Sequence, residues 1–326
     1  MATFPEVRMR RLRRAGIRQM LSTVHVLPAS LIYPLFVDAN LKKKEPVPSM
    51  PGQFRHPLSG LPDLCSEMED SGVMAVMLFG IPSGKDGNGS GAFDRNGIIQ
   101  KAIRKVKENS SLVVVADLCL CEYTDHGHCG IVRNGKVLND ETLKVYARIA
   151  ASQAYAGADM IAPSGMMDGQ VRVIRKELDS KGFGETAIMA YSSKAASSFY
   201  DPFRVAAEST PSFGDRREYQ LNFASRTEHI REMETDIEEG ADIVMVKPAL
   251  TGLDIIARAR DKFSVPIAAY NVSGEYAMIS ACAGNGWMNY RGAVHELLTA
   301  IFRAGADLVV TYHAVEYAHW QKEGVI

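Results

Sequence analysis

The chain reads Gly240-Ala241-Asp242-Ile243-Val244-Met245-Val246-Lys247-Pro248 at the point where one predicted helix passes into one predicted strand. Glycine is typical of a helix end, and the apolar run that follows at once is typical of a buried strand. The same junction occurs at Gly157-Ala158-Asp159 and at Gly305-Ala306-Asp307. Repeated junctions of this kind predict that helices and strands alternate along the chain.

Short apolar runs extend this alternation outward in both directions. We count eight of them, at residues 31–37, 73–79, 112–117, 158–163, 186–192, 241–247, 265–272 and 306–312. Helical periodicity is clearest between them, at residues 141–155, 169–180, 227–239, 253–262 and 293–304. Eight strand-helix units predict an α/β fold, a TIM (β/α)8 barrel over residues 31–326. An open, doubly wound sheet is the alternative.

The composition is that of a globular protein. The chain has 326 residues, of which 46% are hydrophobic and 23% charged, and this is enough for one large α/β domain. A net charge of −1 creates no general attraction to nucleic acid or to a membrane surface. No apolar run reaches the roughly 18 residues of a spanning helix, and no signal peptide follows the start. We therefore expect a cytoplasmic protein without a nucleic-acid or membrane partner.

Residues 1–30 differ from the rest because they are strongly basic. Six arginines lie within residues 8–18, and apolar residues alternate with them: Phe4, Val7, Met9, Leu12, Ile17 and Leu21. A nucleic-acid-binding arm or an organelle transit peptide shares this composition. The interleaved apolar residues favour an arm that packs on a partner subunit.

Three of the five cysteines lie close together, and an odd, clustered set argues against a secreted disulfide framework. Cys119 and Cys121 follow the run at residues 112–117, and Cys129 can return to them across a short loop. Because side chains alternate along a strand, we expect Asp117, Cys119 and Cys121 to point the same way. Three thiolates suit a zinc ion (Zn²⁺) with one open position, as in catalytic zinc sites. Buried cysteines or a disulfide are the alternatives.

Two histidines, His126 and His128, fall inside the loop that leads to Cys129. They could be metal ligands, groups that hold the thiolates in place, or ordinary polar loop residues. We favour the second role, because metal-binding side chains are usually oriented by hydrogen-bonding neighbours.

Two lysines end neighbouring predicted strands. Lys194 follows the fifth run and Lys247 ends the sixth, so both would lie at the carboxyl ends of the barrel strands, where barrel enzymes have their active sites. A lone lysine is normally a solvated surface charge. Burial and a second cation both lower a lysine pKa from about 10.4 toward neutrality. A neutral amine attacks ketones, so the pattern predicts a Schiff base on Lys247 with a carbonyl substrate.

Long loops follow several predicted strand ends. The loop at residues 80–94 is rich in glycine but lacks the spacing of a phosphate-binding loop, and so is expected to be a lid or a surface loop. The loop at residues 195–226 contains Arg204, Arg216 and Arg217. These arginines would supply the counter-charge for a carboxylate or a phosphate on the substrate.

A set of motifs in this order resembles the porphobilinogen synthase family, also called 5-aminolevulinate dehydratase. The resemblance covers nearly the whole chain and implies a TIM barrel that assembles as a homo-octamer and condenses two molecules of 5-aminolevulinate to porphobilinogen. The motifs are Asp117-Leu118-Cys119-Leu120-Cys121, His126-Gly127-His128-Cys129-Gly130, Tyr191-Ser192-Ser193-Lys194, Phe199-Tyr200-Asp201-Pro202-Phe203-Arg204, Phe213-Gly214-Asp215-Arg216-Arg217, Met245-Val246-Lys247-Pro248 and Val272-Ser273-Gly274-Glu275.

The resemblance implies a role for each matching residue. Lys247 would form the Schiff base with the substrate that becomes the propionate side, Lys194 would hold the acetate-side substrate, and Asp117 would assist. The three cysteines would bind a catalytic zinc ion. The remaining residues would bind the two substrate carboxylates: Ser273 and Tyr312 the first, Arg204, Arg216 and Gln220 the second.

The resemblance also has limits. Glu122 stands where proline is common in the family, and Ala195 where an aromatic residue is common. Some members bind an allosteric magnesium ion (Mg²⁺), and Glu232 lies near the expected place, although an exposed helix acid is the simpler interpretation.

Two other functions remain to be compared with this one. A class I aldolase would share the barrel and the Schiff-base lysine, but it needs neither three clustered thiols nor a second lysine. A nucleic-acid-binding or metal-sensing protein would use the arginines and the cysteines and would leave the two lysines unexplained.

Overall fold

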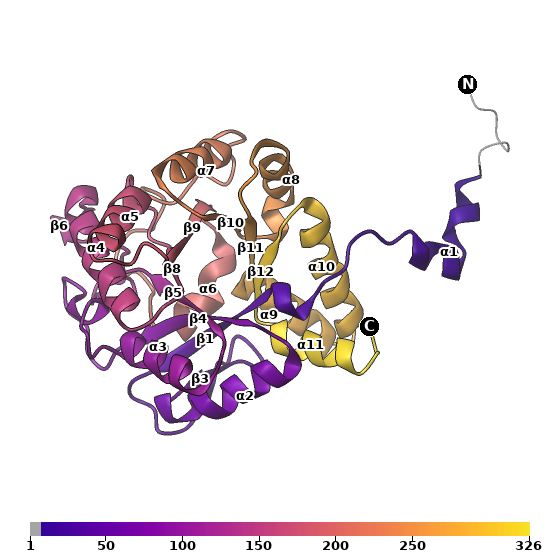
Figure 1. The fold of residues 1–326 in the computed structure, drawn as a ribbon, viewed down its shortest axis with the longest axis horizontal. Coiled ribbons are helices and arrows are strands. Elements are labelled where there is room, and N and C mark those ends of the chain that lie inside the picture. Colours follow the sequence, from indigo (N-terminus) through magenta and orange to yellow (C-terminus); the bar gives the residue numbers. More distant parts are fainter. Residues whose placement is uncertain (1–7) are drawn as a thin grey trace.

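The computed structural model describes residues 8–326, and within them eight parallel strands close into a barrel (Figure 1). The barrel closes where the last strand pairs with the first, through Leu31↔Val309 and Ile32↔Val310. This pairing rules out the open sheet, and each of the eight predicted runs overlaps one strand. The strands are β1 (Leu31–Asp38), β4 (Ala75–Ile81), β5 (Val113–Leu118), β8 (Met160–Pro163), β9 (Ala187–Lys194), β10 (Ile243–Lys247), β11 (Ile267–Asn271) and β12 (Leu308–Thr311).

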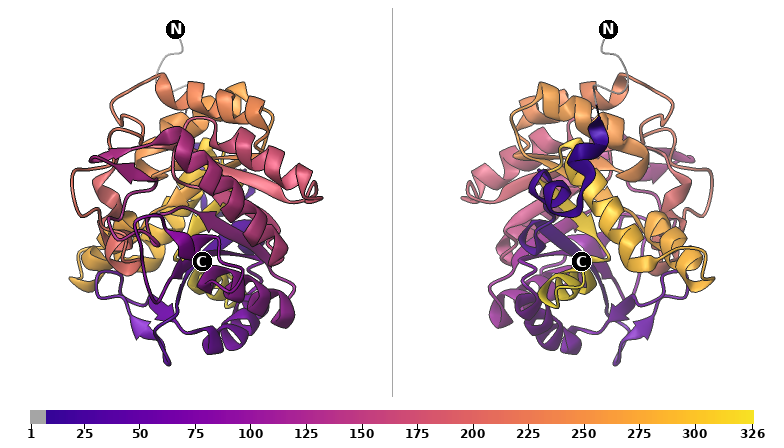
Figure 2. Two further views of the ribbon diagram at one scale, coloured as in Figure 1. Left: turned by 90° about the vertical axis from the view of Figure 1, so that its left-hand side faces the viewer. Right: turned by 90° about the vertical axis from the view of Figure 1, so that its right-hand side faces the viewer.

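Helices surround this barrel on the outside, as the views in Figure 2 show. In α3, Ile99, Ile103 and Val106 recur every three or four residues and are buried, so this face of the helix packs on the strands. The helices after the arm are α2 (Leu61–Ser71), α3 (Ile98–Asn109), α4 (Asn139–Tyr155), α5 (Gln170–Ser180), α6 (Asp201–Ala206), α7 (Glu228–Glu239), α8 (Leu253–Lys262), α9 (Ser273–Gly284), α10 (Tyr290–Ala304) and α11 (Ala314–Lys322). Of these, α6 belongs to the long segment 195–226 that follows β9.

Four very short strands complete the sheet structure. β2 (Glu45–Pro46) and β3 (Phe54–His56) extend the sheet beside β1, and β6 (Val132–Arg133) pairs with β7 (Lys136–Val137) in a separate hairpin. Because β3 pairs with β1 through Phe36↔Arg55, the segment around Arg55 is held at the carboxyl end of the first barrel strand.

The core has two layers, one inside the barrel and one between the strands and the helices. Alternate residues of β4 show the division: Met77 and Phe79 belong to the inner cluster, Val76 and Leu78 to the outer one. Side chains of β4 therefore fill the barrel and pack under the helices in turn.

The repeated Gly-Ala-Asp junction has a structural reason in two parts. Its glycine has a positive φ of 102–119°, the left-handed conformation that ends a helix at little cost only for glycine. Its aspartate accepts a hydrogen bond from a backbone N–H at the start of the preceding barrel strand: Val114 N to Asp159 Oδ2 at 2.8 Å, Ile188 N to Asp242 Oδ2 at 2.7 Å, and Ile267 N to Asp307 Oδ2 at 2.8 Å.

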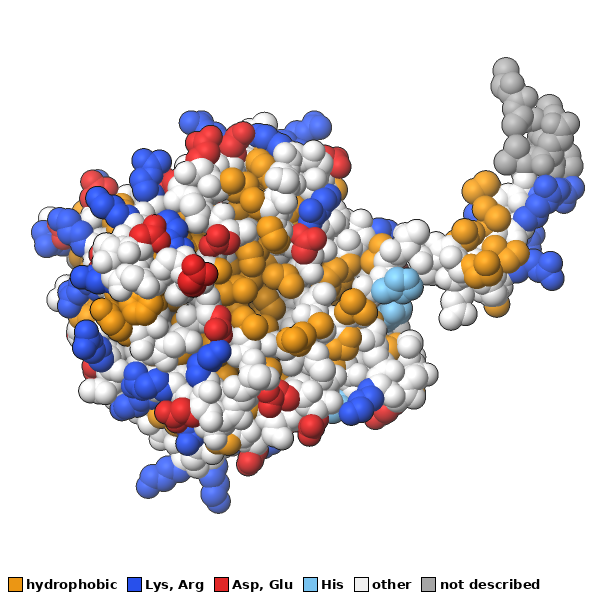
Figure 3. All heavy atoms as spheres, in the orientation of Figure 1, with side chains coloured by type: hydrophobic (Ala, Val, Ile, Leu, Met, Phe, Trp, Pro, Cys, Tyr) orange, Lys and Arg blue, Asp and Glu red, His pale blue; other side chains and the backbone are white. Residues whose placement is uncertain are grey.

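The arm extends away from the barrel (Figures 1 and 3). Its described part contains the 3-10 helix η1 (Met9–Arg13) and the helix α1 (Ala15–Met20), and Met9 and Met20 are 60% and 85% exposed. The predicted arm residues Phe4 and Val7 lie outside the described residues. Near the end of the arm, Val26 is buried and its carbonyl accepts a hydrogen bond from Gln321 Nε2 at 2.6 Å.

Among the helices of residues 8–326, none has the length and apolar character needed to cross a membrane.

We predict that Asp242→Ala lowers the free energy of unfolding by about 2 kcal/mol, because it leaves the buried N–H of Ile188 without its side-chain acceptor. Asp242→Asn keeps an oxygen at this position and should recover most of the loss. Thermal unfolding of the three proteins measures the effect. Asp261→Ala, at an exposed position on α8, is the control, and an equal loss in this variant would contradict the assignment.

Candidate active site

The two predicted lysines lie side by side at the carboxyl ends of β9 and β10. Lys194 and Lys247 are direct neighbours in the strand register. Lys247 follows the alternation of β10, in which Met245 also points into the barrel. Lys194 does not follow the alternation of β9, because Met189 and Tyr191 are the inward residues there. An irregularity in the β9–β10 register turns Lys194 inward, so that both amines reach the same space.

Lys247 is 6% exposed, and aromatic rings surround its amine. Burial lowers the pKa of Lys247 to about 7, and the positive charge of Lys194 adds to this effect. A large fraction of Lys247 is therefore a neutral amine near pH 7. The distances from Nζ to the ring centroids are 4.2 Å for Tyr270, 5.0 Å for Tyr191, 5.1 Å for Tyr200 and 5.2 Å for Phe203.

Asp117 and Lys194 are linked through one serine. Lys194 Nζ donates a hydrogen bond to the carbonyl of Ser164, and Ser164 Oγ donates to Asp117 Oδ2 at 3.2 Å. Asp117 Oδ1 is buried and has no hydrogen-bond partner within residues 8–326. Burial raises the pKa of Asp117 to about 7, and the nearby carboxyl group of Glu122 adds to this effect.

The three clustered cysteines converge as predicted, although not on a strand. The strand β5 ends at Leu118, and the turn that follows brings the sulfur atoms of Cys119, Cys121 and Cys129 within 4.8 Å of one another. All three are buried and none forms a disulfide. Hydrogen bonds from the other two thiols lower the pKa of the Cys129 thiol. Three converging sulfur donors fit one thiophilic metal ion with room for a further ligand.

The histidines of the cysteine loop make hydrogen bonds to residues 195–226, which we call the lid, and within their own loop. His128 shares hydrogen bonds with the carbonyl of Phe213 at 3.0 Å and with the hydroxyl of Tyr219 at 3.1 Å, both in the segment 195–226. His126 Nδ1 accepts from the backbone N–H of His128 at 3.1 Å. The loop that carries the thiols is therefore fastened to the lid.

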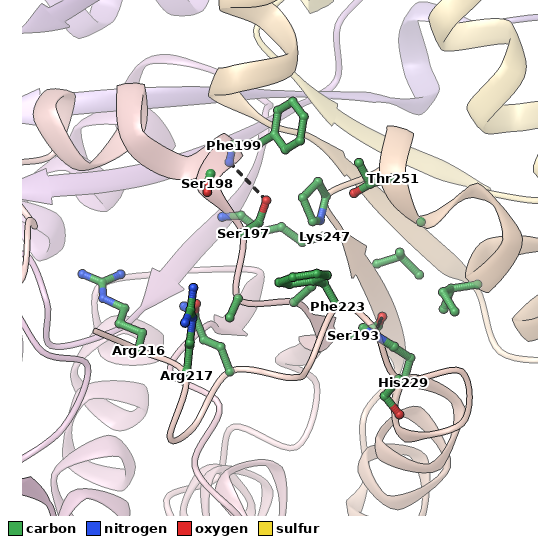
Figure 4. A pocket seen from close by; sticks show the side chains of 18 of the residues that line it. Ser193, Ser197, Ser198, Phe199, Arg216, Arg217, Phe223, His229, Lys247 and Thr251 are labelled. Carbon is green, nitrogen blue, oxygen red and sulfur yellow. Dashed lines mark hydrogen bonds between the residues drawn. The ribbon is translucent and has the colours of Figure 1, made fainter. Parts of the chain in front are cut away.

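The lid brings polar side chains to a cavity of about 470 Å³ at the end of β10 (Figure 4). Arg204, Arg216, Gln220 and Lys247 line it. Arg216 Nη2 donates to the carbonyl of Gly127 at 2.9 Å, yet its Nε atom and the Nε atom of Arg204 have no hydrogen-bond partner in the described part of the chain. The amide oxygen and nitrogen of Gln220 are likewise buried and unpaired. The unpaired N–H groups among these suit an anionic group in the cavity.

A second, small cavity of about 20 Å³ connects the reactive groups. Six predicted site residues line it together with Glu122 and Ser164: Asp117, Cys121, Lys194, Arg204, Arg216 and Lys247. The lid is therefore closed over the lysines.

Ser273 and Tyr312 lie beside these cavities and line neither of them in the described structure. Ser273 Oγ accepts from the N–H of Phe203 at 3.0 Å and donates to the carbonyl of Phe199 at 3.3 Å, which ties it to the lid. The hydroxyl of Tyr312 lies 3.3 Å from that of Tyr270, whose ring faces Lys247.

Glu232 lies apart from the lysines, on α7. It is half-buried, and burial, together with the negative charge of Asp168, raises its pKa to about 7.

Sequence reasoning missed two features of the site. Glu122 is buried, and its Oε2 atom lies 3.3 Å from the sulfur of Cys121. Its only signal in the sequence is that proline is common at this position in the family. The rings of Tyr200, Phe203 and Tyr270 around Lys247 were also missed. Tyr200 and Phe203 do fall inside a quoted motif, which was the available signal.

Known proteins resemble this chain over nearly its full length. The family model for delta-aminolevulinic acid dehydratase matches residues 6–320. The delta-aminolevulinic acid dehydratase of Archaeoglobus fulgidus is 54% identical over 98% of this chain and 99% of its own length. That of Bacillus subtilis is 51% identical over 97% and 98%.

A solved structure is similar in the same way. It is the delta-aminolevulinic acid dehydratase (porphobilinogen synthase) of Toxoplasma gondii in complex with the reaction product porphobilinogen. The TM-score is 0.95 and the sequence identity 42%, over 98% of this chain and 92% of that one. With its barrel, its paired lysines and these relatives, the chain belongs to the delta-aminolevulinic acid dehydratase family.

Proposed function

We propose that this chain condenses two molecules of 5-aminolevulinate to porphobilinogen, with the loss of water. The observation that supports this most directly is the pair of buried lysines, of which Lys247 has a pKa of about 7. Its relatives carry the same activity in their names. Incubating the protein with 5-aminolevulinate and testing for the pyrrole product is the direct experiment.

Lys247 carries the first step in this proposal. The lone pair of its neutral amine forms a bond to the ketone carbon of the first substrate. The ketone oxygen then leaves as water, and an imine remains. Lys194 forms the same kind of bond with the second substrate. The closed lid excludes bulk water, which would otherwise hydrolyse both imines.

The two substrate carboxylates need separate partners. We propose Ser273 and Tyr312 for the first and Arg204, Arg216 and Gln220 for the second. The unpaired Nε atoms of the two arginines and the unpaired amide nitrogen of Gln220 support the second assignment, because a bound carboxylate would accept hydrogen bonds from all three.

Asp117 is proposed to exchange protons with the reacting substrates. It lines the same small cavity as both lysines, and its Oδ1 atom makes no other hydrogen bond to the described residues. Geometry of this kind is the first requirement for a general acid or base.

Zinc is the proposed ion for Cys119, Cys121 and Cys129, since three sulfur donors and an open position suit it better than they suit magnesium. When bound, it would supply a positive charge next to the second substrate. We also propose that Glu232, with Asp168 nearby, binds an allosteric magnesium ion.

The assembly is proposed to be a homo-octamer in the cytoplasm, with residues 1–30 as the arm for subunit contacts and residues 31–326 as the catalytic barrel. The described part of the arm supports the proposed assembly, because its apolar side chains lie next to arginines and face solvent in a single chain (Figure 3). An arm laid on a neighbouring barrel would bury these side chains.

A class I aldolase would explain Lys247 equally well. It would leave Lys194, the three thiols and the unpaired groups of the lid without a use, and the family match also favours the dehydratase.

We predict that borohydride with 5-aminolevulinate adds mass to a peptide that contains Lys247. Trapping requires the neutral amine, so its rate should rise about tenfold between pH 6 and pH 8 and then level off, as for a pKa of about 7. Mass spectrometry measures the labelled fraction. Lys247→Ala should not be labelled in the peptide that contains position 247, whereas Lys176→Ala, at an exposed position, should behave like the parent. A trapping rate that continues to rise up to pH 10 would show an ordinary lysine.

We predict one zinc ion per chain at the cysteine cluster. Cys129→Ser should lose the ion and the activity, whereas Cys282→Ser, outside the cluster, should keep both. Affinity should fall in acid because the thiols must lose protons to bind zinc. Elemental analysis and a zinc titration measure this without an activity assay. Full turnover by a preparation shown to be metal-free would refute the zinc assignment.

We predict that a chain lacking residues 1–22 folds as a barrel but forms a smaller assembly. Leu12→Ser with Ile17→Ser keeps every arginine and should also weaken assembly, because it removes apolar contacts alone. Light scattering gives the number of subunits. If the shortened chain keeps the subunit number of the parent, the arm is not an assembly element, and a DNA gel shift would then test the nucleic-acid alternative.

A further inference from the structure

Three segments that are far apart in the sequence meet at one lid residue, Glu208. Arg55 Nη1 lies 2.8 Å from Glu208 Oε1 and 3.5 Å from Asp38 Oδ2. Lys85 lies 4.0 Å from Glu208 Oε2 and donates a hydrogen bond to the carbonyl of the same residue. We call Asp38, Arg55, Lys85 and Glu208 the lid latch.

One end of the latch is fixed to the barrel. Asp38 ends β1, is 3% exposed and accepts hydrogen bonds from the backbone and side chain of Asn40 at 2.9 and 3.1 Å. Arg55 lies on β3, which is paired with β1. The guanidinium is thus held in place by its backbone and by the buried carboxylate, and it also pairs with Glu45 at 3.3 Å.

The second cation, Lys85, comes from the glycine-rich loop at residues 80–94, for which the sequence predicts a lid or a surface loop. This loop is well anchored beside Lys85. The carboxylate of Asp86 accepts hydrogen bonds from the N–H groups of Asn88 at 2.8 Å and Ser90 at 3.1 Å. Gly89 packs so closely that an added Cβ would lie 2.5 Å from Leu120. The loop therefore presents Lys85 from a defined position.

Glu208 is the residue of the lid latch that belongs to the lid itself. Its φ of 51° is in the left-handed region, which a glutamate rarely adopts without outside support. The next residue, Ser209, uses its carbonyl to accept a hydrogen bond from Arg216 Nη2. Glu208 is thus the direct neighbour in sequence of Ser209, whose carbonyl binds Arg216. Arg216 in turn lines the active-site cavity.

We propose that Glu208 is a positioning residue. Its ion pairs with Arg55 and Lys85 hold the lid closed and set Arg216 for the carboxylate of the second substrate. The inference rests on the proposed function and assigns a role to Asp38, Arg55, Lys85 and Glu208 that the chemistry itself does not require. Because the Glu208 side chain is 48% exposed, dissolved salt should weaken the latch.

The test is Glu208→Gln in the full-length protein. Glutamine keeps the size of the side chain and, like glutamate, must adopt the left-handed backbone conformation at this position. KM for pyrrole formation should rise about fivefold while kcat changes little. The KM of the parent should rise with sodium chloride, and that of the variant should rise less. Hydrogen exchange at residues 203–217 should become faster. Arg55→Gln with Glu208→Gln should cost less than the sum of the two single changes.

Glu234→Gln is the matched control. Glu234 has the same 48% side-chain exposure and pairs with Lys262 at 2.7 Å, away from the barrel mouth. It should leave KM, the salt dependence and lid exchange unchanged. If Glu208→Gln matches the parent in KM and in lid exchange, the latch is refuted. A parent protein that forms no pyrrole would instead refute the proposed function, and lid exchange would still measure the latch.

Discussion

The burial of the Lys247 amine is the constraint on which the rest of the site depends. An ammonium group taken out of water is destabilised, and a second cation on the next strand increases the effect. Within residues 8–326, no direct ion pair compensates for this. It surrounds the amine with aromatic rings and places the carboxyl groups of Asp117 and Glu122 in the same small cavity. Poor solvation therefore keeps a large fraction of this amine neutral near pH 7.

The lid contributes to this burial through the rings of Tyr200 and Phe203, and it is attached at several points. His128 connects it to the cysteine loop, and Arg216 reaches the carbonyl of Gly127 in the same loop. The arrangement of the thiols and the position of the lid arginines are thus mechanically linked. A group bound at the cysteines and an anion bound under the lid would each favour the same closed arrangement.

The barrel supports this site through features that lie away from it. The inner core fills the barrel with side chains such as Met77, Val115 and Met245, so the strand ends are held at fixed separations. At the opposite ends of three strands, the aspartates of the Gly-Ala-Asp junctions bind backbone N–H groups that would otherwise lack partners. Rigid strands can then carry reactive groups at one end while loops of different lengths cover them.

The sequence by itself determined the eight strands, the main helices between them, the cysteine cluster and the position of each lysine at a strand end. Each of these can be recognised from residues a few positions apart. The family motifs added roles that no spacing could supply. Tertiary structure decided the rest. The irregularity of β9 that turns Lys194 inward depends on its pairing with β10. The ring cage of Lys247 needs residues from β9, the lid and β11, and the partners of His128 come from some 85 to 91 residues away. Such contacts form only when the barrel closes. The local pattern of apolar and polar residues does not indicate which distant side chains this closure brings together.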